Sequence, residues 1–516
     1  MTAEIVEVPP RPRRPLPPTA EPAGTPDSGR HWRRLALRGV LVPLIVLFPL
    51  LTLTPSADHR FNIYANGGLY ASRPWHLLRV AVESVPMFLD RGNFRPLGRV
   101  VEWSLDVVAF ALTGLVGLPA NIGLRLVSFG AAVLLTLAAV LFAAAVTTRG
   151  RLFGAAPSVP VALVPFAVGA GLVAAGRTST TVLFGGLYLT TSALVLAVGA
   201  WACRSRRPGL LVVLAGAALA AFNELAYLAV PLATAAVLLR GRVVLGNDWR
   251  TTLRGSGVRF AGLLWLGFLP VFVPVRLLIM QRCAGGGCYT GSDLALGGAP
   301  AALPNRLLSW LPPLMWRRAG GDPLPHLAAL LPVLAFMLLA VLAWRALRQL
   351  PQLPALDRGQ ALGLAGAAAV LLLLAGTLAA LNADVQAIAG QGRWGQGWRD
   401  SGLTTAAGSL LVLACWRRFV PVLLVLLMAG GVLAAAANKD YRDTSGRGQY
   451  PYLHDRIAQE IAGFDRTPAG DARRCALRAA VITIAATERE VERFDVSVTR
   501  ATRHLAGRPF CTRAGR

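Results

Sequence analysis

Long apolar segments, separated by short polar or arginine-rich ones, dominate the hydrophobic pattern of this chain. Runs with few or no charges occupy residues 41–53, 127–146, 210–222, 260–275, 327–343, 362–381 and 420–437. A helix of about 20 apolar residues spans the roughly 30 Å hydrocarbon core of a bilayer, because it rises about 1.5 Å per residue. The pattern therefore predicts membrane-spanning helices.

The shorter apolar stretches, extended by Gly, Thr or Trp neighbours, bring the prediction to about eleven spans. The spans cover residues 36–54, 124–147, 158–175, 182–202, 209–222, 224–240, 260–279, 325–343, 361–381, 402–416 and 419–437. We expect an all-α polytopic membrane protein with a transmembrane domain at 36–437. The Pro- and Arg-rich residues 1–35 cannot bury a core and predict a disordered cytoplasmic tail. Residues 438–516, more charged, predict a small extracytoplasmic domain.

Composition supports a membrane protein and argues against a nucleic-acid binder. Hydrophobic residues make up 54% of the 516 positions and charged residues only 15%, too few for a soluble surface. The net charge of +26 comes almost wholly from arginine, Lys439 being the only lysine. These arginines flank the apolar runs instead of forming one basic face, so the expected partner is the lipid bilayer, with no nucleic acid. Such arginine- and alanine-rich usage is typical of a GC-rich bacterial genome.

The distribution of arginine also predicts an orientation in the plasma membrane. With the N-terminus inside, the predicted inside loops hold more arginines than the short outside ones, as the positive-inside bias requires. Residues 100–118 decide whether the number of crossings is odd or even. This stretch is apolar enough to be a span, yet it carries Glu102 and Asp106. We place it at the outer interface, within a long outside loop at 55–123. The odd number of spans then puts the C-terminus outside the cytoplasm.

The cysteines agree with this orientation. Two cysteines lie in one predicted outside loop as CAGGGC, two more lie in the C-terminal tail, and two stand alone inside or within a span: Cys283 and Cys288, Cys475 and Cys511, and Cys203 and Cys415. An oxidising exterior favours disulfides between the paired ones. A zinc site is disfavoured, because no two-residue spacing or His cluster accompanies them, and we expect no metal site.

Ionisable residues near the lipid boundary are the candidates for function. In the long outside loop, Asp58 follows the first span directly, and Asp90, Arg95, Arg99 and Glu102 come later. Residues 74–89 and 96–115 are half-amphipathic and predict two interfacial helices.

This arrangement resembles the GT-C superfamily of multispan glycosyltransferases. The shared features are a first span, a long outside loop with an early acid and two interfacial helices, further spans and an external C-terminal domain. The resemblance implies transfer of a sugar from a polyprenyl-phosphate donor to a cell-envelope glycan acceptor. Those enzymes often carry two adjacent acids in this loop, whereas here His59 follows Asp58. A second acid would have to be Asp90, Glu102 or Glu224.

The implied chemistry needs a carboxylate base for the acceptor hydroxyl and cations for the departing lipid phosphate. Asp58 is the first candidate for the base, and the alternative is that it pairs with Arg60. Arg95 and Arg99, four residues apart, either hold a phosphate between them or anchor the loop to headgroups. Glu224 is either functional or the polar apex of a helical hairpin. We expect no organic cofactor, and the sequence leaves open whether a divalent metal is needed.

The last short outside loop supplies a second group of candidates. Arg393, Trp394, Trp398 and Arg399 stand among glycines and glutamines. Tryptophan stacking on a sugar and arginine binding of phosphate would make this a substrate-binding loop. The alternative is an aromatic belt with snorkelling arginines.

Two other functions stay open, a transporter or flippase and a non-catalytic integral membrane protein. The phosphate loop, GxGxxG, HExxH and GxSxG motifs are absent from the sequence. A transporter typically has polar or broken helices near the midplane, repeated in two halves, and the sequence has no such repeat. Charges concentrated in outside loops favour the glycosyltransferase.

Overall fold

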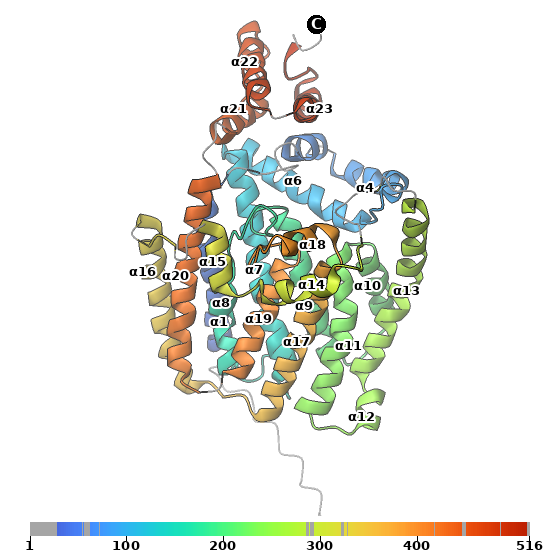
Figure 1. The fold of residues 1–516 in the computed structure, drawn as a ribbon, viewed down its shortest axis with the longest axis vertical. Coiled ribbons are helices and arrows are strands. Elements are labelled where there is room, and N and C mark those ends of the chain that lie inside the picture. The colour runs from blue at the N-terminus through green and yellow to red at the C-terminus, as the bar shows by residue number, and fades with distance from the viewer. Residues whose placement is uncertain are drawn as a thin grey trace, which may run out of the picture.

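The computed structural model describes residues 28–53, 55, 62–71, 73–284, 288, 294–320, 325–327, 329–416, 418–445, 450–485 and 487–512. Figure 1 shows a bundle of long helices with further helices stacked on one end. Across these residues the structure is helical, with a single isolated bridge between Leu294 and Asn382 in place of any strand.

Seven helical segments are long and apolar enough to cross a membrane, counted over the residues that the structure describes. They are α7 (Ala120–Thr147), α9 (Gly185–Arg204), η3–α11–η4 (Glu224–Leu228, Ala229–Leu239 and Arg240–Val244), α13 (Ser256–Cys283), α16 with η6 (Leu330–Leu347 and Leu350–Gln352), α17 (Arg358–Ala380) and α20 (Val420–Ser445). Three shorter apolar helices accompany them, α8 (Val159–Ala170), α10 (Leu210–Ala220) and α19 (Ser401–Cys415). The chain is thus an all-helical protein with several helices of membrane-spanning character, as predicted.

The first and last predicted spans differ in their bounds from the helices found. α1 (Ser28–Leu47) begins before residue 36, and η1 (Phe48–Leu50) follows it. α20 continues past residue 437 to Ser445, and Lys439 pairs with Asp443 one turn later at 2.9 Å. Asn438, completely buried, accepts a hydrogen bond from the Ala174 amide and donates to the carbonyl of Val46. Asn438 therefore lies within a continuous helix that ends at Ser445.

Four elements lie across one end of the bundle, which we call the α6 end (Figure 1). They are η2 with α3 (Ile63–Gly67 and Gly68–Tyr70), α4 (Pro74–Glu83), α5 (Val85–Leu89) and α6 (Pro96–Val116). Proline at the first position starts α4 and α6, and Gly117 ends α6 with a φ of 67°. The two predicted interfacial helices correspond to α4–α5 and α6, and α6 is not among the seven long apolar segments. α12 (Trp249–Arg254) lies at the opposite end (Figure 1).

Three short helices accompany the long helices in the half of the bundle nearer the α6 end: α14 (Ala299–Leu308), α15 (Pro312–Gly320) and α18 (Ala383–Gly390). The bridge from Leu294 to Asn382 ties the segment before α14 to the start of α18. Gln386 adds a hydrogen bond of 2.5 Å to the carbonyl of Ala295. These contacts fix α14 and α18 beside each other.

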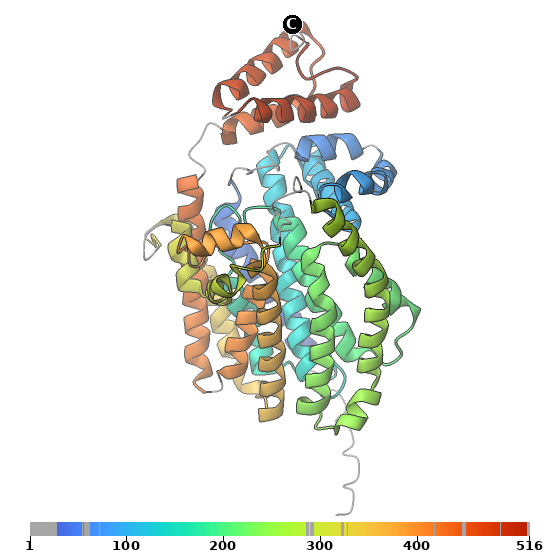
Figure 2. The same ribbon diagram turned by 45° about the vertical axis from the view of Figure 1, so that its right-hand side comes forward.

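Helices α21 (Tyr450–Ala462), α22 (Pro468–Ile484) and α23 (Glu488–Ala506) form a layer over the α6 end (Figure 2). Their apolar side chains share one buried cluster with η2, α6 and α7, including Ile457, Phe494 and Val498 against Ile63 and Phe110. The C-terminal helices therefore pack directly onto the elements of the long loop.

Candidate functional site

The start of α6 rests directly on the turn between α10 and η3. The Leu97 amide donates a hydrogen bond of 3.1 Å to the carbonyl of Ala221. Next to it Gly98 faces the carbonyl oxygen of Phe222, which a Cβ at position 98 would approach to 2.2 Å. Only glycine allows this contact, and the contact brings the first two turns of α6 to Glu224.

Five charged residues from three elements gather at this contact. We call Arg95, Arg99, Glu102, Glu224 and Arg276 the carboxylate–arginine cluster. Arg95 Nη2 lies 3.7 Å from Glu102 Oε2, and Arg276 Nη2 lies 3.9 Å from Glu224 Oε1. Both separations exceed a hydrogen bond, so each carboxylate is held by charge while its oxygens keep capacity to accept.

Arg99 is the most buried cation of the cluster, with 2% of its surface exposed. Its guanidinium lies over the ring of Phe88, and neither Nη1 nor Nη2 has a hydrogen-bond partner among the described residues. Burial, reinforced by the charge of Arg95, lowers the pKa of Arg99 to about 9. Buried guanidinium N–H groups without acceptors are suited to bind an anion.

Arg276 also donates to the Tyr227 hydroxyl at 3.0 Å and lies over the Tyr227 ring. From another direction Arg399 lies close enough to Glu224 to interact with it electrostatically. The Arg399 guanidinium stands 5.3 Å from the ring of Trp398 and 5.9 Å from that of Tyr188. Residues 391–400 therefore reach the cluster through Arg399.

The same loop forms one wall of a cavity of about 680 Å³. The other walls are the loop 171–184, the end of α15, α18 and the last turns of α20. Its charged lining residues are Arg177, Arg318, Arg393 and Asp384, and its aromatic ones are Trp398 and Tyr441. We call this space the arginine cavity.

Hydrogen bonds join the two loops that wall the arginine cavity. The Gly397 amide donates to the Ala175 carbonyl at 2.7 Å, and the Thr178 hydroxyl donates to the Gly397 carbonyl at 2.6 Å. Gln396 bridges further, donating to Thr178 and accepting from Arg318 Nε at 3.0 Å. The wall that carries Trp398 is thus fixed by backbone and side-chain contacts.

Positive charge is in excess in this cavity. No carboxylate of the described chain forms an ion pair with Arg177, Arg318 or Arg393. Burial, together with the charge of Arg393, lowers the pKa of Arg318. The guanidiniums of α15 and of the 391–400 loop are therefore close neighbours that repel each other.

The structure unites some of the predicted site residues and separates others. Glu102, Glu224, Arg95 and Arg99 lie in the carboxylate–arginine cluster, with Arg399 beside it. Arg393 and Trp398 line the arginine cavity, whereas Trp394 does not and is 45% exposed. The side chain of Asp90 is 63% exposed and paired with Arg282, which is not a member of the cluster, and Asp58 lies outside the described residues.

Sequence reasoning missed several residues of both sites. Arg276 sits within an apolar helix, where an ionisable residue is itself a signal of function. Arg177, Arg318 and Asp384 lie in short loops and helix ends, and their charge alone does not distinguish them from headgroup anchors. No described group of three His, Cys, Asp or Glu side chains is placed to hold a metal ion.

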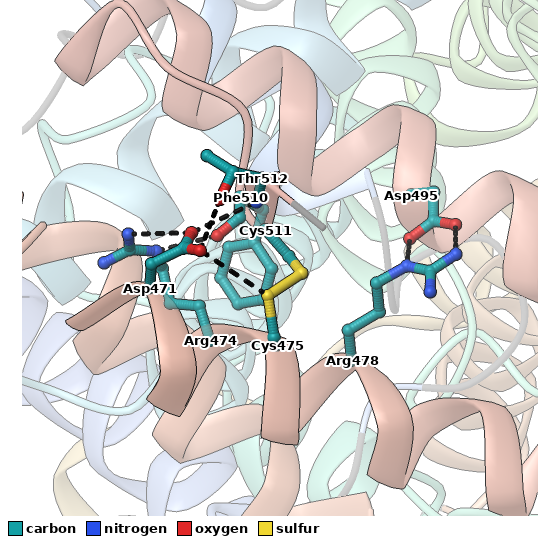
Figure 3. Close-up of a disulfide and its surroundings, with 8 residues drawn as sticks. All are labelled: Asp471, Arg474, Cys475, Arg478, Asp495, Phe510, Cys511 and Thr512. Atoms are coloured by element: carbon teal, nitrogen blue, oxygen red, sulfur yellow. Dashed lines mark hydrogen bonds and ion pairs between the residues drawn. A yellow bond between two sulfur atoms is a disulfide. The ribbon is translucent and has the colours of Figure 1, made fainter. Parts of the chain in front are cut away.

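Both predicted cysteine pairs stand at disulfide-bonding distance. Cys283 and Cys288 have sulfurs 1.98 Å apart and pack on Gly92, in the turn between α5 and α6. Cys475 and Cys511 have sulfurs 1.92 Å apart and tie the end of the chain to α22 (Figure 3). Beside this second bridge, Arg474 donates to the Phe510 carbonyl at 2.7 Å (Figure 3). The first bridge supports the segment that leads into Arg95, and the second supports the C-terminal layer.

Comparison with known proteins identifies no relative: no protein-family model, no curated protein and no solved structure matches the chain. The two sites are therefore interpreted from their own chemistry.

Proposed function

We propose that this protein is a GT-C-like membrane glycosyltransferase, which moves a sugar from a polyprenyl-phosphate donor to a cell-envelope acceptor at the outer face of a bacterial plasma membrane. The observation that carries the proposal is the gathering of two glutamates and three arginines where α6 meets η3 and α13. Carboxylates for proton transfer and cations for a leaving phosphate are the parts that such a transfer needs.

In this proposal Glu224 is the base. Its side chain is 25% exposed, and Arg276 at 3.9 Å favours its ionised form without hydrogen bonding to it. Glu224 takes the proton of the acceptor hydroxyl as the acceptor oxygen bonds to the anomeric carbon of the sugar. The bond from that carbon to the phosphate oxygen breaks, and polyprenyl phosphate leaves.

Arg95 and Arg99 bind the departing phosphate in the same scheme. Arg95 is the N-cap residue of α6 and its carbonyl accepts from the Arg99 amide in the first turn, and the Arg99 Nη atoms lack other acceptors within the described structure. Glu102, whose side chain is 8% exposed, lies 3.7 Å from Arg95 and orients it. The cluster then combines one base, two phosphate ligands and one positioning carboxylate.

The proposal includes eleven spans with the N-terminus inside and the C-terminal helices outside. The position of α1 supports this orientation. Arg125, in the second turn of α7, donates to the carbonyl of Leu53 and to that of Val182. The chain after α1 is thereby held beside the start of α7, near α6, so Ser28 and the C-terminal helices lie at opposite ends of the bundle.

The test is a profile of cell-envelope glycans in cells whose only copy of the gene for this protein carries a single substitution. Glu224→Gln should lower the transferred product by about 10²-fold or more, the usual effect of losing a general base. Glu102→Gln should give a smaller loss, and Asp90→Asn, at an exposed paired position, should leave the profile unchanged. Unchanged glycans in both glutamate variants and in Asp58→Asn and Asp384→Asn, at normal protein levels, would overturn the proposal and favour a transporter.

Asp58 and Asp384 are the alternative bases. Asp58→Asn and Asp384→Asn belong in the same series, because Asp58 follows the first span and Asp384 lines the arginine cavity. Loss of product in only one of these two, with Glu224→Gln active, would assign the base to that residue instead.

A further inference from the structure

The arginine cavity carries more positive charge than its single carboxylate neutralises. Arg177, Arg318 and Arg393 line it together with Asp384. The three cations come from separate segments, namely the loop 171–184, α15 and the loop 391–400. Since the described chain provides no ion-pair partner for them, the charge is available to a ligand.

Part of this charge is held in a fixed orientation. Arg318 uses Nε to bond Gln396, which leaves the Nη groups of its planar guanidinium for another acceptor. Gln396 is itself fixed by Thr178, and its carbonyl accepts from Arg306 at 2.8 Å. An arginine held in this way suits phosphate or carboxylate oxygens, which accept two parallel N–H groups.

The remaining lining suits a sugar ring. Trp398 and Tyr441 provide aromatic surface, and Thr178, Thr444 and Ser445 provide hydroxyl groups. A volume of about 680 Å³ lies within the range of small-molecule sites. Aromatic faces beside hydroxyl and guanidinium groups can bind both the apolar and the polar sides of a saccharide.

The place of the cavity favours a ligand without a lipid chain. Its walls are loops, short helices and the last polar turn of α20, at Tyr441, Thr444 and Ser445. The 391–400 loop takes part in both sites, because Trp398 lines the cavity and Arg399 interacts with Glu224 of the carboxylate–arginine cluster. The cluster and the cavity are thus neighbouring sites that share one loop.

We propose that the arginine cavity binds a saccharide that carries phosphate or carboxylate groups and no lipid, and that this anionic saccharide is the acceptor of the transfer. The assignment as acceptor rests on the proposed glycosyltransferase function, whereas the binding itself does not.

The test is equilibrium binding to the full-length protein in lipid nanodiscs, with glucose 6-phosphate, glucuronate, glucose, inorganic phosphate and undecaprenyl phosphate as probes. The two anionic saccharides should bind at least about tenfold more tightly than glucose. Arg318→Gln and Arg393→Gln should each weaken that binding about tenfold, since each removes a charge-assisted contact. Trp398→Ala should weaken the binding of the saccharides and leave the binding of inorganic phosphate unchanged.

Arg317→Gln is the matched control, because Arg317 is the exposed neighbour of Arg318 on the same helix and does not line the cavity. An equal loss of affinity in Arg317→Gln would mean that the positive charge of the surface, and not the cavity, binds the probes. Equal affinity for glucose, or no binding by either anionic saccharide, would overturn the proposal. Binding of undecaprenyl phosphate alone would assign the cavity to the lipid-linked donor.

This experiment is separable from the test of the transferase. Glu224→Gln should bind the anionic saccharides as tightly as the wild-type protein, because Glu224 lies outside the cavity. Saccharide binding together with unchanged glycans in all the glutamate and aspartate variants would retain the cavity site and overturn the proposed glycosyltransferase.

Discussion

Arg306 and Asp400 form the most buried ion pair of the described structure, with side chains only 1% and 2% exposed and Nη2 2.6 Å from Oδ1. Arg306 also donates to the Gln396 carbonyl, so this one side chain supports the wall of the arginine cavity. Removing one partner of a buried pair leaves the other charge without compensation.

Arg306→Met should therefore lower the free energy of unfolding by about 3–5 kcal/mol, measured by denaturant unfolding in detergent. The double variant Arg306→Met/Asp400→Leu should recover part of that loss, because no charge stays buried. Arg317→Met, at an exposed site, provides the baseline. Equal stability of Arg306→Met and the wild-type protein would show that the pair is not needed for folding.

Asp106 predicts a dependence of stability on pH. It is 2% exposed on α6 and accepts a hydrogen bond of 2.8 Å from Asn66. Burial raises the pKa of Asp106 well above its usual range, Asn66 opposes the rise, and the charge of Glu102 adds to it. The folded state therefore keeps a proton that the unfolded state releases above about pH 4.

Stability of the wild-type protein should fall as pH rises from about 4 towards the folded pKa of Asp106, by up to about 1.4 kcal/mol per pH unit from this group. Asp106→Asn keeps the acceptor for Asn66 and does not titrate. Its free energy of unfolding relative to wild type should therefore increase between pH 5 and pH 8. The opposite trend would mean that Asp106 is ionised in the folded protein.

At the scale of elements, α6 owes its position to a contact between backbones. Gly98 lies against the Phe222 carbonyl, and Gly92 lies against the bridge of Cys283 and Cys288. A helix that approaches another backbone this closely needs glycine at the contact. These two glycines fix where Arg95 and Arg99 stand.

Gly98→Ala should destabilise the protein and lower product formation, because the added methyl group would stand 2.2 Å from the Phe222 oxygen and push α6 outward. Gly130→Ala, in α7 with nothing within 4 Å of its added carbon, is the control. Alanine is normally the better helix former by about 1 kcal/mol, so the control should be neutral or stabilising. Thermal unfolding and glycan profiles of both variants check this. A change in stability of the same sign in Gly98→Ala and Gly130→Ala would refute the close contact.

At the scale of the whole molecule, the sequence predicts the individual helices better than the contacts between them. Apolar length and composition suffice to find the long apolar helices, because a helix satisfies its backbone hydrogen bonds internally. The cysteine pairs were likewise predicted from their shared places in one outside loop and in the C-terminal tail, and the structure has them at bonding distance. How many of the helices cross the membrane stays a prediction.

The membership of the site was only partly predictable. Carboxylate and arginine residue types at the ends of apolar runs indicated Glu102, Glu224, Arg95 and Arg99. Their grouping depends on the close contact of Gly98 with the Phe222 carbonyl. Sequence periodicity does not indicate such a tertiary contact. For the same reason Asp90, with an equally suggestive position in the sequence, turned out to be a surface ion pair with Arg282.

The last three helices, α21–α23, also complete the burial of apolar side chains from earlier elements. Ile63 and Phe110, near the beginning of the chain, share a buried cluster with Phe494 and Val498, near its end. During synthesis the apolar faces of Ile63 and Phe110 therefore stay uncovered until α23 has been made. A chain cut between α20 and α21 would keep every long apolar helix yet leave α6 without its cover.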